Sequence, residues 1–323
     1  MIKIIILYFM IAFNSLYAQV NQEWVAKFED TVYSEPSSIT VDKIGNTYIS
    51  GYYSSQTGGT RFLTLKYNSS GILQWKRLYK EPQSLTNTVV KNISDRLGNL
   101  YVMGFSEQGV KVSDIILIKY DTYGDSVWVR KYKGRSIARD MVVDKYSNVY
   151  ITAASRGVTS NDYQTLKYDS SGNLLWNAIY TNGEVPNAMA LDSSGNVYVT
   201  GESSSFFTEY LTVKYSNSGV LQWVRTHGSA LDAEGTSIAV DLTGNIYATG
   251  FITLSNGNSN YSTLKYDSLG NLLWNKEFDK LPSKSPTKIL VDSSGNCFIV
   301  GSSAILKYDS SGKSIVGRHF FVL

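Results

Sequence analysis

The sequence is poor in cysteine and histidine. Its 323 residues hold one cysteine, Cys297, and two histidines, His227 and His319. A single cysteine excludes an intramolecular disulfide, so a buried core must hold the chain together. Cys297 stands where the corresponding segments have apolar residues, and we interpret it as a buried side chain. Two distant histidines do not define a nucleophile, a base and an orienting group, so no catalytic residue can be named.

The sequence also has few prolines, no helical periodicity and little net charge. The chain has 5 prolines and a formal net charge of +3. No stretch repeats its apolar residues with the spacing of an amphipathic helix. The near balance of charge gives no electrostatic footprint for nucleic acid. We therefore expect an all-β protein that does not bind nucleic acid.

The first 18 residues have the layout of a secretory signal peptide. Lys3 precedes an apolar run from Ile4 to Phe13, and a short polar stretch ends at Ala18. The run is about 10 residues long, against the roughly 20 needed to span a bilayer. We expect cleavage near Ala18 and export to the periplasm, the cell surface or the medium, with no membrane span. Residues 19–323 then form a single domain.

Two short phrases recur along the whole chain. The first reads "LDSSGNVYVTG" at 191–201, and its asparagine recurs at Asn46, Asn99, Asn148, Asn196, Asn245 and Asn296. The second reads "LKYDSSGNLLW" and alternates with the first. A period near 50 residues is typical of a repeat architecture such as a propeller.

Each repeat predicts four strands joined by short turns. One such sheet is too small to be stable alone and must stack on its neighbours. Closing the stack into a ring covers every sheet. We count six copies and predict a β-propeller of six four-stranded blades, with seven blades as the alternative.

The repeated phrases are also turn signals. In Asp-x-x-Gly-Asn the aspartate can accept hydrogen bonds from the turn backbone, and the glycine supplies the left-handed conformation. We assign this structural role to Asp42, Gly45, Asp95, Gly98, Asp192, Gly195, Asp241, Gly244, Asp292 and Gly295. Ser147 replaces the glycine in the third copy, so we expect a locally adjusted turn there.

These phrases resemble the bacterial β-propeller repeat family called SBBP. The resemblance rests on Asp-x-x-Gly-Asn-x-Tyr-x-x-Gly, followed by an acidic residue five positions before a lysine, as in Asp114 and Lys119. Arg61 and Asn260 replace the acid in two copies. The resemblance covers essentially the whole mature chain and implies an exported propeller of no assigned role. The family name implies seven blades, against the six copies found here.

A closed propeller needs contacts that join its last blade to its first. Residues 23–30 form a stray segment in which Trp24 matches the tryptophan of the second phrase, whereas the last copy has Val316 at that place. We hypothesise that residues 23–30 join the last blade and close the ring by hydrogen bonds. Contact of this segment with the first repeat alone would contradict the hypothesis.

The variable connections predict where a ligand would bind. In a four-stranded meander, both tight turns lie on one face, and the loops after the second and fourth strands lie on the other. Loops on a rigid scaffold are where binding residues concentrate. The candidate ligand-binding residues on this face are Tyr52, Tyr53, Phe105, Glu202, Phe206, Phe207, His227, Asp232 and Glu234.

For three features of the sequence, a functional interpretation competes with a structural one. Calcium needs six to eight oxygen ligands, whereas the Asp-x-x-Gly turns require no hydroxyl between Asp and Gly, so we expect no metal or cofactor and keep calcium as an alternative. The lysines of the second phrase could bind anions, but we predict stems packed on the blade with charges paired to carboxylates. The tryptophans are predicted to pack between blades.

We therefore predict an exported binding or scaffold protein that recognises an extracellular glycan or protein through one face, without catalysis and as a monomer. The alternative is a propeller hydrolase or lyase acting on a sugar or lactone. Unrepeated carboxylates gathered at one mouth of the channel would favour the enzyme. A structural surface component is a third interpretation.

Overall fold

The computed structural model describes residues 22–28, 33–54, 58–107, 109, 113–157, 161–203, 208–228, 231–279, 285–302 and 304–319. They form six four-stranded antiparallel sheets, each made of four consecutive strands. Blade 1 contains β1 (Ser34–Val41), β2 (Thr47–Ser54), β3 (Thr60–Tyr67) and β4 (Leu73–Tyr79), and blade 2 contains β5 (Thr86–Ser94), β6 (Leu100–Glu107), β7 (Ser113–Tyr120) and β8 (Ser126–Lys133). Blade 3 contains β9 (Ser136–Val143), β10 (Val149–Arg156), β11 (Asn161–Tyr168) and β12 (Leu174–Tyr180), and blade 4 contains β13 (Gly183–Leu191), β14 (Val197–Ser203), β15 (Tyr210–Tyr215) and β16 (Leu221–His227). Blade 5 contains β17 (Ala233–Val240), β18 (Ile246–Thr253), β19 (Ser259–Tyr266) and β20 (Leu272–Phe278), and blade 6 contains β21 (Pro286–Val291), β22 (Cys297–Gly301), β23 (Ala304–Tyr308) and β24 (Ser314–His319).

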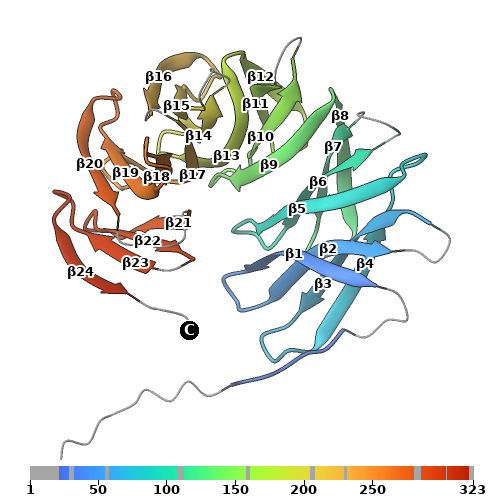
Figure 1. The fold of residues 1–323 in the computed structure, drawn as a ribbon. Coiled ribbons are helices and arrows are strands. Elements are labelled where there is room, and N and C mark those ends of the chain that lie inside the picture. Colours follow the sequence, from blue (N-terminus) through green and yellow to red (C-terminus); the bar gives the residue numbers. More distant parts are fainter. Residues whose placement is uncertain are drawn as a thin grey trace, which may run out of the picture.

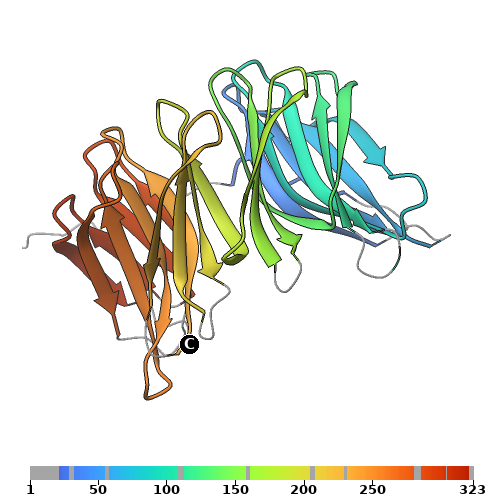
Figure 2. The ribbon, with the colours of Figure 1, turned by 90° about the horizontal axis from the view of Figure 1, so that it is seen from above.

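The six blades stand around a common axis as a β-propeller, which confirms the predicted fold class and blade number. The first strand of each blade faces the axis, and the fourth strand lies outermost (Figure 1). Each innermost strand packs against that of the next blade, from β1 through to β21. None of the closely packed strand pairs joins blade 6 to blade 1. The blades therefore form an open arc. In the view of Figure 2, blades 4 to 6 lie lower in the picture than blades 1 to 3.

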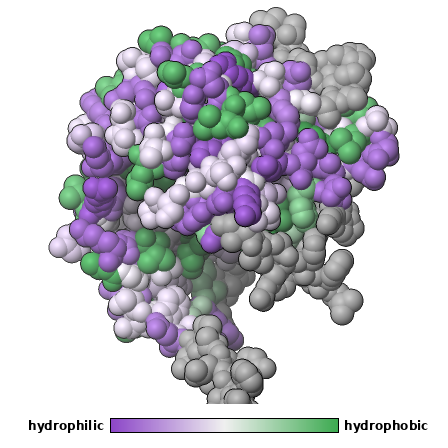
Figure 3. All heavy atoms as spheres, turned by 90° about the vertical axis from the view of Figure 1, so that its left-hand side faces the viewer, coloured by the Kyte–Doolittle hydropathy of each residue, from purple (hydrophilic) through white to green (hydrophobic). Residues whose placement is uncertain are grey.

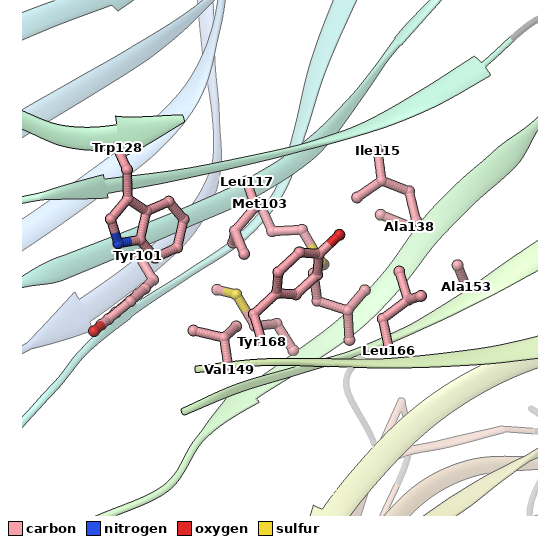
Figure 4. Packing of buried hydrophobic residues seen from close by; sticks show 12 residues of the cluster. Tyr101, Met103, Ile115, Leu117, Trp128, Ala138, Val149, Ala153, Leu166 and Tyr168 are labelled. Atoms are coloured by element: carbon pink, nitrogen blue, oxygen red, sulfur yellow. The ribbon is translucent and has the colours of Figure 1, made fainter. Parts of the chain in front are cut away.

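The core consists of the junctions between neighbouring blades. Between blades 2 and 3, Met103, Leu117, Val149 and Leu166 are at most 1% exposed, and Trp128 closes the outer end of the cluster (Figure 4). Burying an aliphatic side chain of this size contributes about 1.5–3 kcal/mol. By contrast, exposed apolar side chains are scattered among polar ones on the outer surface (Figure 3). Stability therefore comes mainly from blade-to-blade packing.

One contact recurs at every junction, as the predicted role of the tryptophans requires. The tryptophan of the fourth strand lies on a left-handed glycine of the next blade, in the pairs Trp75 and Gly124, Trp128 and Gly172, Trp176 and Gly219, Trp223 and Gly270, and Trp274 and Gly312. The glycine has no Cβ, so the indole ring can reach the turn backbone. This contact fixes the outer end of each blade against its neighbour.

The lysines of the second phrase do not pair with carboxylates, and that expectation was wrong. Lys66 Nζ donates to the carbonyl oxygen of Thr122 in the next blade at 2.9 Å, and Trp75 Nε1 donates to the same oxygen at 3.3 Å. Four further junctions repeat this arrangement, with the acceptors Ser170, Asn217, Ser268 and Ser310. The turn leaves this backbone carbonyl without a strand partner, and the lysine satisfies it.

The Asp-x-x-Gly-Asn turns owe their shape to one carboxylate each. Asp42 Oδ1 accepts the backbone N–H groups of Ile44 and Asn46, and its Oδ2 accepts the side chains of Asn46 and Tyr48. Gly45 has a φ of 85°. These bonds bind the turn to the strand that follows it.

The turn at Ser147 differs from the expectation. It is not adjusted: Ser147 keeps the left-handed conformation with a φ of 63°, and its N–H donates to the carbonyl of Asp144 at 3.0 Å. Its Oγ donates to Asp95 Oδ2 in blade 2 at 2.9 Å. This bond between blades offsets the strain of a left-handed serine.

The N-terminal segment does not close the ring, so the closure hypothesis was wrong. Trp24 stacks on Tyr67, and Ala26 and Phe28 pack against Leu63 and Leu65, all of which belong to blade 1. The fourth-strand place in blade 6 is taken by β24, which pairs with β23. Residues 22–28 instead cover blade 1 where the fourth strand of a preceding blade would lie.

Candidate functional site

The variable connections gather on the face opposite the Asp-x-x-Gly turns. They are shorter than the sequence suggested, because the second strand of each blade runs further: β2 ends at Ser54 and β6 at Glu107. Adjacent connections are also tied together, since Ala233 N–H donates to the carbonyl of Thr208 at 2.9 Å. The described candidate residues except Asp232 therefore lie on strands, mostly near their ends, where side-chain direction is fixed by the sheet.

Blades 4 and 5 bring several unrepeated polar side chains together on this face, near the axis. Glu202 lies at the end of β14, Glu234 at the start of β17, and Glu184 and Asn187 on β13. Asn187 Nδ2 donates to Glu234 Oε1 at 2.7 Å and to the carbonyl of Gly235 at 2.9 Å. We call Glu184, Asn187, Glu202, Asp232 and Glu234 the carboxylate cluster.

Burial and like charge change the protonation of the cluster. Burial, together with the charges of Glu234 and Glu184, raises the pKa of Glu202 to about 7 against the opposing effect of Arg139. Burial also raises the pKa of Glu234, although the Asn187 hydrogen bond and Arg139 oppose it. Near neutral pH, the cluster can therefore hold an ionised carboxylate beside a protonated one.

A buried tyrosine forms the base of this region. Tyr163 of β11 is 0% exposed, and its ring lies against Gly183 and Gly201 of blade 4. Its hydroxyl has no hydrogen-bond partner among the described residues. Burial, with the charges of Glu202 and Glu234, holds the pKa of Tyr163 well above its usual range. A Cβ on Gly201 would lie 2.0 Å from the carbonyl oxygen of Val185 and 2.5 Å from the Tyr163 hydroxyl, so only glycine fits between them.

The other predicted site residues lie elsewhere. Tyr52 and Tyr53 are half-buried on β2, and the Tyr52 hydroxyl donates to Glu35 Oε2 at 2.7 Å. Phe105 is half-buried on β6. Blades 1 and 2 stand across the axis from blade 4, so these aromatic residues do not join the carboxylate cluster (Figure 1).

His227 is separated from the cluster although it is close to Asp232 in sequence. It ends β16, the outermost strand of blade 4, and its Nε2 lies 3.4 Å from Asn275 Nδ2 in blade 5. Burial lowers its pKa, and Glu277 opposes that effect. Phe206 and Phe207 lie outside the described residues.

The structure also contains a hollow that the sequence did not predict. It has a volume of about 540 Å³, lies at the outer edge of blades 1 and 2, and is lined by Glu81, Pro82, Gln83, Asp114, Lys131, Lys133, Gly134 and Arg135. Lys131 bridges Glu81 at 2.8 Å and Asp114 at 3.2 Å. Burial would lower the pKa of Lys131, but these two carboxylates outweigh it and raise the pKa.

Backbone strain marks the same hollow. Gln83 and Arg135 are left-handed, with φ values of 63° and 53°, and among the described non-glycine residues only Ser147 shares this conformation. Strained residues concentrate at functional sites. No spacing or motif in the sequence signals these two residues.

Two features are absent from the described ranges. No three or more His, Cys, Asp or Glu side chains are placed there to hold a metal ion. Nor does that part of the chain contain a helix of the length and hydrophobicity that would cross a membrane.

Comparison with known sequences supports the fold and leaves the role open. Residues 180–207 match the β-propeller repeat family SBBP, which bears out the resemblance seen in the repeated phrases. No curated protein matches the chain. Because the matched stretch contains Glu184, Asn187 and Glu202, the carboxylate cluster is built partly within a recognised repeat of this family.

Two solved structures align with this chain at low sequence identity. A eukaryotic initiation factor aligns with a TM-score of 0.51 and 9% identity over 87% of this chain and 66% of its own, so this chain spans just under two thirds of that protein. A protein of unknown function from Bacteroides caccae aligns with a TM-score of 0.44 and 11% identity over 80% of this chain and 90% of its own. The likeness to the first structure extends to the fold alone.

Proposed function

We propose that this chain is an exported binding protein that takes a polyhydroxylated ligand, such as a glycan, at the carboxylate cluster between blades 4 and 5. The observation that carries the proposal is the gathering of Glu184, Asn187, Glu202 and Glu234 on the ends of three neighbouring strands. Glu35 of blade 1 is the counterpart of Glu234, but no other blade repeats the whole set. Residues that depart from the repeat are not needed by the shared scaffold, so we assign them to the ligand site.

The donor and acceptor pattern suits sugar hydroxyl groups. An ionised carboxylate accepts hydrogen bonds, whereas a protonated one can also donate. The amide of Asn187 is already oriented by Glu234 and Gly235, so its remaining oxygen is held in a fixed direction. Fixed polar groups on strand ends lower the entropic cost of binding.

A hydrolase acting on an extracellular sugar is the second candidate, and one observation favours it. Glu202, with a pKa of about 7, adjoins Glu234 closely enough for the two charges to interact. Glycosidases use two carboxyl groups, one of which donates a proton near neutral pH. Turnover of a bound glycan, lost in Glu202→Gln, would support this candidate.

Binding of the purified protein to an array of neutral and acidic glycans, at pH 5.5 and pH 8, tests the main proposal. We expect a hit that weakens about tenfold or more in Asn187→Ala, which loses the oriented amide, and in Glu234→Gln, which loses a charged acceptor. Glu35→Gln, on the same face of blade 1, is the matched control and should bind as the parent does. A hit that is indifferent to both cluster substitutions would place the ligand elsewhere and refute the proposal.

A further inference from the structure

The two ends of the arc are the uncovered halves of one repeated junction. On each innermost strand, one side chain points toward the preceding blade and is buried by it: Asn92 is 2% exposed, Met141 0%, Met189 4%, Ile238 5% and Ile289 1%. The same position in blade 1 is Ile39, which is 65% exposed. Blade 1 therefore lacks the neighbour that covers this face elsewhere.

Blade 6 is uncovered on the opposite face. Val300 and Ile305 are 39% and 45% exposed. Their counterparts in blades 1 to 5 are at most 1% exposed, and most are hydroxyl residues: Ser50, Thr64, Met103, Leu117, Thr152, Thr165, Thr200, Thr212, Thr249 and Thr263. Blade 6 thus exposes apolar side chains at two positions where most of the covered blades have buried polar ones.

The two open faces match each other position by position. At the first junction, Asn92 Nδ2 donates to Ser50 Oγ at 2.9 Å. Ile39 is the counterpart of Asn92, and Val300 is the counterpart of Ser50. A junction between blade 6 and blade 1 would therefore bring two apolar side chains together where the first junction has a polar pair.

The tryptophan contact of the missing neighbour is already made at the open face of blade 1. Lys307 pairs with Val316 in the register that joins lysine to tryptophan in the other blades, so blade 6 has no tryptophan to offer. Blade 1 already has Trp24 on Gly71, 2.7 Å from the point where a Cβ would lie. Residues 22–28 hold the place that the fourth strand of a preceding blade takes at the other junctions, so this segment has to move aside when β24 of a second copy docks.

Blade 1 keeps an apolar hollow beside this contact. It has a volume of about 240 Å³ and is lined by Ala26, Phe28, Ile49, Leu63 and Leu65, among others. Val102, Ile116 and Ile118, the counterparts of Ile49, Leu63 and Leu65 in blade 2, are 0% exposed in the junction with blade 1. The segment 22–28 therefore covers only part of the face that a whole blade covers elsewhere.

We propose that blade 6 of one copy packs on blade 1 of a second copy, so that the chain assembles head to tail. The occupant is a second copy because one chain carries both matching faces and holds them apart at the open ends of the arc (Figures 1 and 2). Such contacts close into a ring when the rotation permits and otherwise continue as a filament. This assembly is independent of the proposed ligand site.

Mass measured by light scattering over a hundredfold range of protein concentration tests the proposal. We expect a mass that rises with concentration. Val300→Lys should weaken self-association by about tenfold or more, because the lysine would be buried without a partner. Ile39→Glu should do the same from the other side. Both side chains are exposed in the single chain, so both variants should fold.

Mixing provides the decisive comparison. Val300→Lys mixed with Ile39→Glu should associate where neither variant does alone, since the unchanged blade 6 of the second variant can pack on the unchanged blade 1 of the first. Ile179→Lys, at a 52% exposed position on outer strand β12, is the matched control and should assemble as the parent does. A protein that stays monomeric at every concentration, or an assembly unaffected by both substitutions, would overturn the proposal.

Discussion

Trp24 lies on Gly71 in the way that Trp75 lies on Gly124: in both pairs, a Cβ on the glycine would come within 2.8 Å of the indole ring. The first tryptophan precedes the first blade, and the second belongs to its fourth strand. The chain thus begins its described part with an isolated copy of the contact that joins all its blades. The contact is a property of the repeat, and its contribution to the free energy of unfolding can be measured at any junction.

Gly124→Ala should destabilise the fold by about 2–5 kcal/mol. The left-handed backbone, with a φ of 84°, costs about 1–2 kcal/mol for any residue with a Cβ. The added methyl group would also lie 2.8 Å from Trp75 Cδ2, and such overpacking costs about 1–3 kcal/mol more. Urea unfolding followed by tryptophan fluorescence measures the change.

Gly244→Ala is the control for this prediction. Gly244 has the same φ of 84°, but its nearest neighbour would be Ser268 Cβ at 3.9 Å. It should lose only the backbone contribution of about 1–2 kcal/mol. Equal losses in the two variants would mean that the tryptophan contact adds nothing to the free energy of unfolding.

The fold was predictable because its signals are local and repeated. Asp42 and Gly45 specify a turn by hydrogen bonding and backbone conformation alone, and the turn sets the register of the strands on either side. The lysine acceptor was not predictable in the same way. Lys66 reaches a carbonyl 56 residues away, and only the packing of two blades places that oxygen beside it.

The site was predictable only in part, for the same reason. Glu202, Asp232 and Glu234 drew attention as acidic residues in variable stretches, and blades 4 and 5 do bring them together. Asn187 and Glu184 lie in a variable connection but were not singled out, because only the structure shows that β13 brings them beside Glu202 and Glu234. His227 was misplaced because closeness in sequence does not reveal that β16 is the outermost strand and β17 the innermost.

Glu202→Gln should make the protein more stable at pH 8 by about 1–2 kcal/mol, after allowance for solvent screening. The folded carboxyl titrates near pH 7, above its usual 4.5. Between these values the folded state holds a proton that the unfolded state has released, so the parent loses stability as the pH rises. The variant lacks this loss, and the two should converge near pH 4. Thermal melts across pH 4–8 measure it, and a constant difference at every pH would contradict the assigned titration.

Asp95→Asn should destabilise the fold at neutral pH and reduce its sensitivity to acid. Burial would raise the pKa of Asp95, but hydrogen bonds from Asn99, Ser147 and the Leu97 N–H outweigh it and lower the pKa. A lowered folded pKa means stability that is present above the unfolded value of 3.8 and is lost as the pH falls further. The amide cannot accept all these bonds, which costs about 1–3 kcal/mol at pH 7.

Melts of the parent and Asp95→Asn between pH 2.5 and pH 7 measure this prediction. The difference between the two should shrink as the parent carboxylate takes up its proton. Asp125→Asn is the control, because Asp125 accepts only a weak contact from Arg77 at 3.6 Å and is largely exposed. A difference for Asp95→Asn that grows toward low pH would reverse the assigned sign.

Arg135→Gly should stabilise the protein by about 0.5–1 kcal/mol. Its φ of 53° strains any residue with a Cβ, and removing that strain outweighs the added flexibility of glycine in the unfolded chain. Arg156→Gly is the control: it lies on β10, donates its N–H to the Arg135 carbonyl at 3.2 Å, and should lose stability by a similar amount. Urea midpoints of both variants decide the matter. A stabilised Arg135→Gly would show that the chain tolerates strain to direct an arginine into the hollow beside Lys133, whereas a loss would mean that the arginine side chain itself stabilises the turn.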